Sequence, residues 1–250
     1  MAIECSYYLE PVDTADLAQR FLKAFAAILS HSNYAMVLDA ACTVTSRCGR
    51  CTSTCPVYQT SNDPRDIPCM RSELLLKIYR RYFTPGGALR SRFGIPWELD
   101  EAYLNTMAEE YYRCTACRRC KLECPMGIDH GLITHLGRWV LAEVGIVPKA
   151  LVVATREQLE GDTHNTSAIP KAALVDTCEF LEEDCVDEHG LKIEFPIDRE
   201  GGEYVFFPAV SDYLLEPDTL TGNAAVMSAT GGSWTIGTGA YDGINYGLFF

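Results

Sequence analysis

The chain has 250 residues, and 48% of them are hydrophobic, which is enough apolar material for one large core or two smaller ones. Its formal net charge of -13 argues against a nucleic-acid partner, because a phosphate backbone requires a basic surface. Residues 1–20 lack the basic and apolar segments of a signal peptide, and charges interrupt the longest apolar stretch, residues 131–154. We therefore expect a cytoplasmic chain that reaches the inner face of the membrane only through a partner.

Helical patterns dominate the first part of the chain. Apolar residues recur there with the spacing of amphipathic helices. The predicted helices cover residues 13–29, 34–41, 72–83, 97–112, 127–145 and 149–159. The turn-forming residues 63–68 predict a loop, and Pro85 is expected to end the third of these helices.

Helices and strands alternate in the second part. The predicted elements are a helix over 171–188, strands over 191–195 and 203–207, a helix over 219–227 and a strand-like run over 233–237. This order is typical of a parallel sheet, and the unbroken apolar run 203–207 indicates a buried strand. The predicted fold class is α+β, with a mainly helical domain over 1–160 and the start of an α/β domain over 161–250. The apolar residues 245–250 predict that the natural chain continues or that this end packs on a partner.

Twelve cysteines carry the strongest functional signal. Four of them form the run Cys-x2-Cys-x2-Cys-x3-Cys-Pro, which is the spacing of a bacterial-ferredoxin-type [4Fe-4S] site. They are Cys114, Cys117, Cys120 and Cys124. A zinc-binding interaction module would use two separated pairs of ligands around one ion, so a third close cysteine favours iron–sulfur clusters. Disulfides are disfavoured in a reducing compartment.

An earlier copy of the motif contains Cys48, Cys51 and Cys55 but has Thr45 in place of the first cysteine. In two-cluster ferredoxins the fourth cysteine of each run binds the other cluster. Cluster B would then be held by four cysteines, namely Cys55, Cys114, Cys117 and Cys120. Cluster A would receive Cys48, Cys51 and Cys124 and would need a fourth ligand.

Three solutions compete for this fourth ligand. Cys42 reaches the cluster if residues 43–45 bulge out as a loop, and Cys69 reaches it from beyond the turn-rich segment. In the third solution no cysteine binds, and the site holds a [3Fe-4S] core or a labile iron at Thr45. We favour Cys42 because it closes the shortest loop and so has the lowest ordering cost.

The remaining candidates point to ordinary structural roles. Cys5, Cys178 and Cys185 are expected to be core or surface thiols, and His130 and His135 to be surface residues. The basic residues around the motifs, Arg47, Arg50, Arg113, Arg118, Arg119 and Lys121, either serve solubility or offset the charge of a cluster. The sequence contains no phosphate-binding loop, nucleophile elbow or paired-carboxylate motif, so it predicts no catalytic residue.

Both motifs and their flanks resemble the α-helical ferredoxin-like domain of heterodisulfide reductase iron–sulfur subunits. The residues that carry this resemblance are 34–58 and 113–129, and segments 71–83, 180–207 and 231–250 are similar to the D-type subunit and its relatives in sulfite-reductase-associated membrane complexes. The resemblance implies two [4Fe-4S] clusters bound by the seven motif cysteines, with Cys42 as the eighth ligand after an insertion. It also implies docking on a membrane cytochrome b that exchanges electrons with a quinol.

The chain departs from disulfide-reducing members of this family in one respect. They carry Cys-Cys-Gly motifs for the thiol chemistry, and this sequence contains none. We therefore expect an electron-transfer subunit of a (mena)quinone-linked complex, which works with further redox subunits and has the reactive thiol/disulfide or other redox site outside this sequence. The alternative within the oxidoreductases is the iron–sulfur subunit of a flavin-dependent dehydrogenase.

Overall fold

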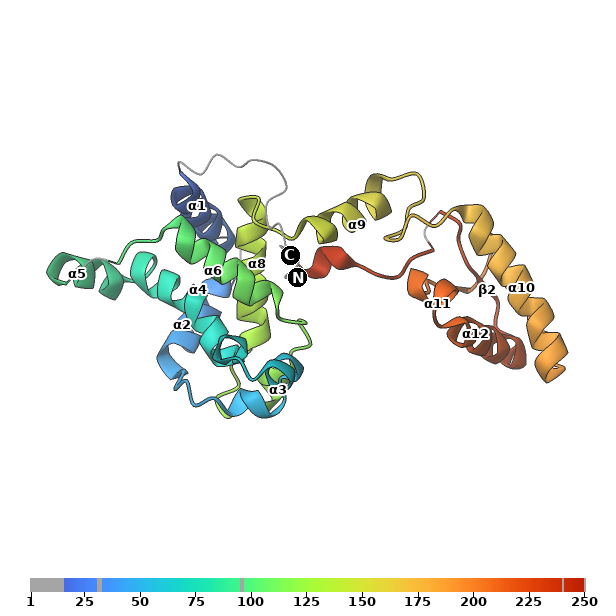
Figure 1. Cartoon of the computed structure of the whole chain (residues 1–250), viewed down its shortest axis with the longest axis horizontal. Coiled ribbons are helices and arrows are strands. Elements are labelled where there is room, and N and C mark those ends of the chain that lie inside the picture. Colours follow the sequence, from blue (N-terminus) through green and yellow to red (C-terminus); the bar gives the residue numbers. More distant parts are fainter. Residues whose placement is uncertain (1–15, 31–32, 95–96, 240, 250) are drawn as a thin grey trace. The chain divides into compact units, whose positions relative to one another are not determined.

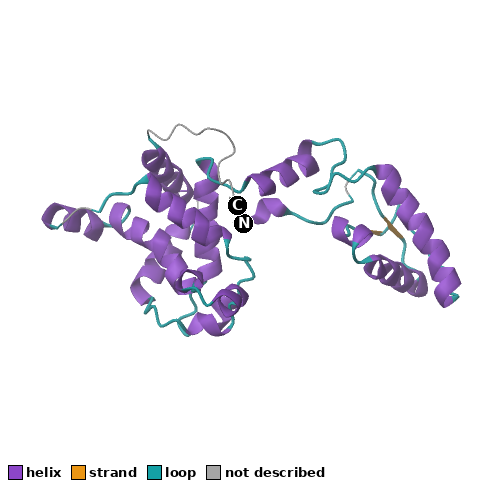
Figure 2. Ribbon diagram, in the orientation of Figure 1, coloured by secondary structure: helices purple, strands orange, loops and turns teal. Residues whose placement is uncertain are grey.

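The structure, a computed structural model, describes residues 16–30, 33–94, 97–239 and 241–249. The chain forms two compact units: the first comprises the described residues up to Lys149 together with Phe249, and the second extends from Ala150 to Leu248. Helix α9 (Lys149–Glu160), predicted as the last helix of the first domain, thus lies almost entirely in the second unit. Helices predominate in both units (Figure 1, Figure 2).

In the part that the structure describes, the first unit contains the five helices predicted before residue 149 and three short helices that were not predicted. The helices are α1 (Leu17–Ser30), α2 (Tyr34–Val44), α3 (Pro56–Ser61), α4 (Pro68–Tyr82), α5 (Pro85–Phe93), α6 (Glu101–Tyr112), α7 (Arg119–Glu123) and α8 (His130–Glu143). Two 3-10 turns, η1 (Arg50–Ser53) and η2 (Pro64–Asp66), lie in the loops. Within the described residues, we find no helix that is long and apolar enough to cross a membrane.

Two helices begin at prolines that the sequence pattern assigned to loops or helix ends. Helix α4 begins at Pro68 instead of residue 72, and Pro85, which was predicted only to end the preceding helix, also begins α5. Proline is tolerated in a first turn because the backbone N–H group has no helical partner there. As a result, Cys69 and Arg71 belong to the first turn of α4.

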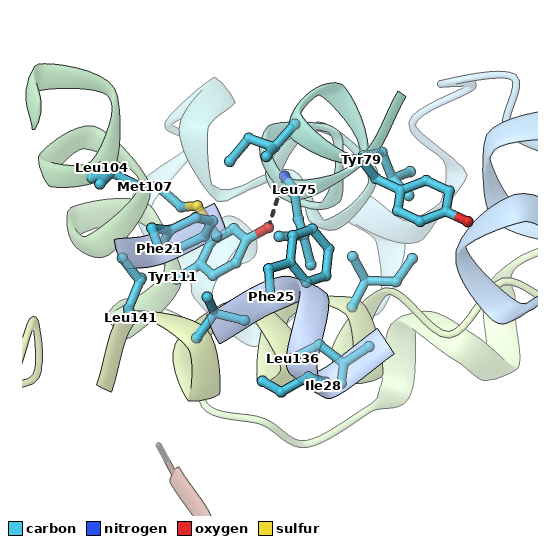
Figure 3. Close-up of a cluster of buried hydrophobic side chains, with 14 of the residues drawn as sticks. Phe21, Phe25, Ile28, Leu75, Tyr79, Leu104, Met107, Tyr111, Leu136 and Leu141 are labelled. Carbon is cyan, nitrogen blue, oxygen red and sulfur yellow. Dashed lines mark hydrogen bonds between the residues drawn. The ribbon is translucent and has the colours of Figure 1, made fainter. Parts of the chain in front are cut away.

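The core of the first unit lies around α8, against which α1, α4 and α6 pack. Figure 3 shows side chains from these four helices meeting there, among them Phe25, Leu75, Met107 and Leu136. The buried hydroxyl of Tyr111 accepts a hydrogen bond from the backbone N–H of Leu75 at 3.2 Å. This bond joins α6 to α4 and satisfies a polar group that would be costly to bury alone.

The second unit combines helices with a small sheet. After α9 come α10 (Lys171–His189), β1 (Tyr204–Val205), α11 (Val210–Leu214), α12 (Pro217–Thr230), β2 (Trp234–Thr235) and the 3-10 turn η3 (Tyr246–Phe249). The two strands are parallel, with Tyr204 opposite Trp234, so the predicted parallel pairing is confirmed.

The strand predictions were wrong in two respects. Residues 191–195 form no strand: Ile193 and Phe195 are buried by packing on the core, and pairing in this region is limited to a bridge between Ile197 and Ile236. Strand β1 was expected to be buried, but Tyr204 and Val205 are 51% and 53% exposed. The apolar pattern of 203–207 therefore does not produce a central strand within the described residues.

The close contact of α8 with α6 predicts that Gly137 does not tolerate a side chain. An added Cβ would lie 2.0 Å from Cε2 of Tyr111 and 2.6 Å from Cε of Met107. We expect Gly137→Ala to lower the free energy of unfolding by about 1–3 kcal/mol, because both neighbours are buried and must move. The measurement is anaerobic urea unfolding followed by the helical circular dichroism signal.

Gly86→Ala is the matched control, because it also adds a Cβ to a helical glycine of the first unit. Nothing lies within 4 Å of that Cβ. We expect the free energy of unfolding to rise by less than about 1 kcal/mol, because alanine has a higher helix propensity than glycine. Equal stabilities of the two variants would contradict the packing described for Gly137.

Candidate metal centres

Four cysteines from both motifs line one pocket of the first unit, which has an empty volume of about 350 Å³. They are Cys55 from the first motif and Cys114, Cys117 and Cys120 from the second. Cys55 and Cys120 are buried, Cys114 is half-buried and Cys117 is exposed. These are the cysteines predicted to hold cluster B, and we call this cavity pocket B.

A second pocket, with an empty volume of about 290 Å³, is also lined by four cysteines. They are Cys48 and Cys51 from the first motif, Cys124 from the second, and Cys69 from the first turn of α4. We call this cavity pocket A. Its exposure pattern matches that of pocket B, because Cys51 is buried like Cys120 and Cys48 is exposed like Cys117.

The two motif loops also share their backbone conformation. Arg47 and Gly49, on either side of Cys48, have positive φ angles of 52° and 73°, and Ala116 and Arg118, on either side of Cys117, have 55° and 58°. Three of these residues carry a side chain, so the conformation is costly and needs compensation. Such alternation turns backbone N–H groups toward one side and forms an anion-binding concavity of the kind found at iron–sulfur sites. The first motif thus has the loop of a complete motif despite Thr45.

Cys42 lies outside the lining of both pockets. It belongs to α2, which continues to Val44, so residues 43–45 do not form the loop that would have carried Cys42 to the cluster. The half-buried side chain packs against the hydrophobic core, and this burial raises the pKa of the thiol. Thr45 lines pocket A instead.

Cys69 is in direct contact with the first motif. Its side chain packs with Cys51 in one buried cluster, and both residues are about 5% exposed or less. The interaction between the two thiols holds the pKa of Cys69 below its usual value and the pKa of Cys51 above it. The backbone N–H groups of Gly49 and Met70 also point at the Cys69 sulfur. Cys69 therefore has the surroundings of a thiolate ligand.

The first turns of α4 and α8 meet between the pockets. Ser72 Oγ lies 3.0 Å from His130 Nδ1, and the Ser72 hydroxyl also donates to the carbonyl oxygen of Pro68 at 3.0 Å. His130 lines both pockets and is 3% exposed, so its prediction as a surface residue was wrong. Burial lowers the pKa of His130 to about 4, and the ring is neutral near pH 7. Sequence spacing gave no signal for this role, since it depends on packing between distant helices.

Arg71 is a second residue that the sequence did not single out. It is 1% exposed and lines pocket B. One guanidinium nitrogen donates to the Asp66 carboxylate at 3.2 Å, and Arg113 donates to the other oxygen of that carboxylate at 2.7 Å. The buried Nε of Arg71 has no hydrogen-bond partner among the described residues. An arginine in a helix with many charges usually faces solvent, which is why the pattern was uninformative.

Four thiols per pocket are the donor set that iron–sulfur clusters require. Within the described ranges, we find no group of three or more His, Cys, Asp or Glu side chains that could hold a single metal ion. The thiolates of a cubane cluster bind different iron atoms and therefore surround a volume. The residues of both pockets fit such a group.

The other cysteines do not join either pocket. Cys178 and Cys185 are 1% and 2% exposed in the core of the second unit, which confirms their prediction as structural thiols. Cys5 lies outside the described residues.

Comparison with known proteins supports this chemistry. Residues 41–128, which include both motifs and Cys69, match the family described as a 4Fe-4S dicluster domain. The chain is 29% identical over 209 residues to Hdr-like menaquinol oxidoreductase iron-sulfur subunit 2 of Archaeoglobus fulgidus. The aligned region covers 81% of this chain and 37% of that protein. No solved structure matches.

Two further relatives match over shorter regions. The D-type subunit of the dihydromethanophenazine:CoB–CoM heterodisulfide reductase of Methanosarcina acetivorans is 29% identical over 113 residues, which is 45% of this chain and 26% of that protein. The glycolate oxidase iron-sulfur subunit of Escherichia coli is 30% identical over 96 residues, which is 38% of this chain and 19% of that protein.

The chain spans about 37% of the length of the two Archaeoglobus relatives that it matches over most of its own length. Both are named as iron–sulfur subunits of Hdr-like menaquinol oxidoreductases, and the predicted resemblance is thereby confirmed. Over most of its length the chain is similar to the iron–sulfur subunits of heterodisulfide reductase-like complexes.

Proposed function

We propose that this chain is an electron-transfer subunit with two [4Fe-4S] clusters, one in each four-cysteine pocket. The pairing of the two pockets is the observation that carries this proposal, because two adjacent centres form a path for electrons and a single structural metal would need only one. The clusters would supply one-electron redox chemistry, and the chain would hold them at a fixed separation and limit their contact with water.

The ligand sets follow from the pocket linings. For the centre in pocket B we propose Cys55, Cys114, Cys117 and Cys120. For the centre in pocket A we propose Cys48, Cys51, Cys69 and Cys124, with Cys69 in the role first expected for Cys42. The contact between Cys69 and Cys51 and the location of Cys42 in a continuous helix support this change.

The proposed partners come from the relatives and from the family resemblance. Two relatives are named as subunits of menaquinol oxidoreductases, so we propose a membrane partner of the cytochrome b type that oxidises a quinol and delivers electrons to this chain. The chain would bind this partner at the inner face of the membrane. The electrons would continue to a thiol/disulfide or other redox site, which we place outside this sequence because it has no Cys-Cys-Gly motif.

A second candidate function is the iron–sulfur subunit of a flavin-dependent dehydrogenase. The similarity to the glycolate oxidase subunit of Escherichia coli favours it over the region of the cysteine motifs. Isolation of the tagged chain from its native cells distinguishes the two candidates. A b-type haem spectrum in the isolated complex supports the quinol-linked function, and flavin released by acid supports the dehydrogenase.

The first prediction of this proposal concerns the iron and sulfide content of the protein. We expect anaerobically purified protein to be brown, to contain about eight iron atoms per chain and to show a broad visible absorption that dithionite bleaches. Iron and sulfide assays with visible spectroscopy provide the measurement. A colourless protein with stoichiometric zinc would instead identify a zinc-binding interaction module.

The fourth ligand of the pocket A centre is the second prediction. Cys69→Ser should lose or alter one of two electron paramagnetic resonance signals and about four of about eight iron atoms, because one thiolate is removed from a four-cysteine set. Cys42→Ser is the matched control and should keep both signals, since this thiol lies in neither pocket. Loss of a signal in Cys42→Ser together with an unchanged spectrum in Cys69→Ser would reverse the assignment.

Crosswise ligation is the third prediction, and it compares four serine variants. Cys55→Ser should affect the same resonance signal as Cys117→Ser, although the two cysteines belong to different motifs. Cys124→Ser should affect the same signal as Cys48→Ser. If Cys55→Ser instead matches Cys48→Ser, each motif binds its own cluster and the pocket linings do not describe the ligand sets.

A further inference from the structure

The surroundings of the two pockets differ in buried positive charge. Arg71 lines pocket B and is 1% exposed. Arg138, which is 3% exposed, donates from its guanidinium to the backbone carbonyl oxygens of Tyr111 and Cys114, so its charge also lies beside this pocket. A charge removed from water is weakly screened and acts strongly on its neighbours.

Pocket A has no matching buried cation among its lining residues within the described part of the chain. Its lining contains Arg47, whose side chain is 52% exposed and bonded to Glu73 at 2.6 Å. Arg118 in the lining of pocket B is comparable, because it is 55% exposed and paired with Asp129. Each pocket thus has one exposed arginine that is paired with a carboxylate. The two pockets therefore differ in their buried arginines, which only pocket B has in its surroundings.

The charge of Arg71 is only partly neutralised by its own ion pair. Asp66 is fully buried and also accepts hydrogen bonds from Arg113 and Ser61, so one carboxylate serves two guanidinium groups. Asp63 pairs with Arg65 at the surface and also with Arg113, so two aspartates serve three arginines in this network. Glu110 lies in the electrostatic field of Arg71, Arg65 and Arg113, and burial raises the pKa of its carboxyl.

The buried Nε of Arg71 is a hydrogen-bond donor without a partner among the described residues. A buried N–H donor without a partner is destabilising, and such donors are rare in folded proteins unless a ligand or water satisfies them. Arg71 is in the wall of a pocket lined by four cysteines, so a sulfur atom of a bound cluster is an acceptor within that wall. Hydrogen bonds to sulfur and nearby positive charge both raise the reduction potential of an iron–sulfur cluster.

We propose that Arg71 donates a hydrogen bond from Nε to a sulfur of the pocket B centre and that buried Arg71 and Arg138 give this centre the higher reduction potential of the two. In the singly reduced protein the electron then resides at the pocket B centre. Reduction adds one electron, which comes from the proposed quinol-oxidising partner or, in a titration, from dithionite, to one cluster and makes or breaks no covalent bond. This inference rests on the proposed function, because it requires a cluster in each pocket.

The wild-type protein provides the first test, through a redox titration followed by electron paramagnetic resonance. Cys55→Ser removes the pocket B centre, so the signal that persists in this variant identifies the pocket A centre. We expect the pocket A signal to be the one that appears at the lower potential in the wild type. The reverse order would overturn the inference while leaving two working clusters, whereas a protein without any iron–sulfur signal would overturn the proposed function itself.

Arg71→Gln provides the second test, because it removes the charge and the Nε donor while Asp66 keeps Arg113 and Ser61 as partners. We expect a lower potential for the pocket B signal and an unchanged potential for the pocket A signal. Arg65→Gln is the matched control: it removes one positive charge from the same network, but its side chain is 57% exposed and lines neither pocket. Equal shifts in the two variants would contradict a specific role of Arg71.

Arg71→Lys distinguishes an effect of Arg71 on the reduction potential of the pocket B centre from a purely structural role. It keeps the buried charge but loses the guanidinium fork, so the potential of the pocket B centre should lie between those of the wild type and Arg71→Gln. A structural role predicts loss of iron in both variants with no change in the potential of the clusters that remain. That result would overturn the contribution of Arg71, even if the wild-type order of potentials agrees with our expectation.

Discussion

The hydrogen bond between Ser72 and His130 joins the first turns of α4 and α8 at the position where both four-cysteine pockets meet. From this junction, α4 contributes Cys69 to pocket A and Arg71 to pocket B. Helix α8 contributes His130 to both, and the backbone N–H of Gly131 points at the sulfur of Cys120. The geometry of either pocket therefore depends on the packing of α4 on α8, and the hydrophobic core around α8 is what fixes it.

Helix ends and buried arginines give these pockets a local field opposite to the charge of the whole chain. The formal net charge is -13, yet the first turns of α4 and α8 direct the positive ends of their helix dipoles toward clustered thiols. The basic residues that stand out in the sequence, such as Arg47 and Arg118, are exposed and paired with carboxylates. The stronger contribution to the field comes from Arg71 and Arg138, which are buried. Only the packed structure separates these two groups of arginines.

The cysteine spacing was sufficient to predict which motif cysteines share a pocket, because it is the spacing of two-cluster ferredoxins, in which the fourth cysteine of each run serves the other cluster. It was not sufficient for Cys69, since that residue depends on α4 beginning at Pro68 and on the packing of this helix against the first motif. His130 and Arg71 escaped prediction for the same reason. In the second unit the parallel pairing of β1 and β2 followed from the alternation of elements, whereas burial did not, because it depends on the neighbours that cover a strand.

The exchange of cysteines between the motifs makes each pocket depend on both motif loops. Neither loop contains four cysteines for its own pocket, since Cys55 lines pocket B and Cys124 lines pocket A. An ion pair between Arg50 of η1 and Glu123 of α7, at 2.9 Å, joins the two motif loops. A loop that folded alone would leave each pocket with an incomplete set of thiols. Each pocket therefore has its full set of four thiols only when both loops lie on the α4–α8 junction.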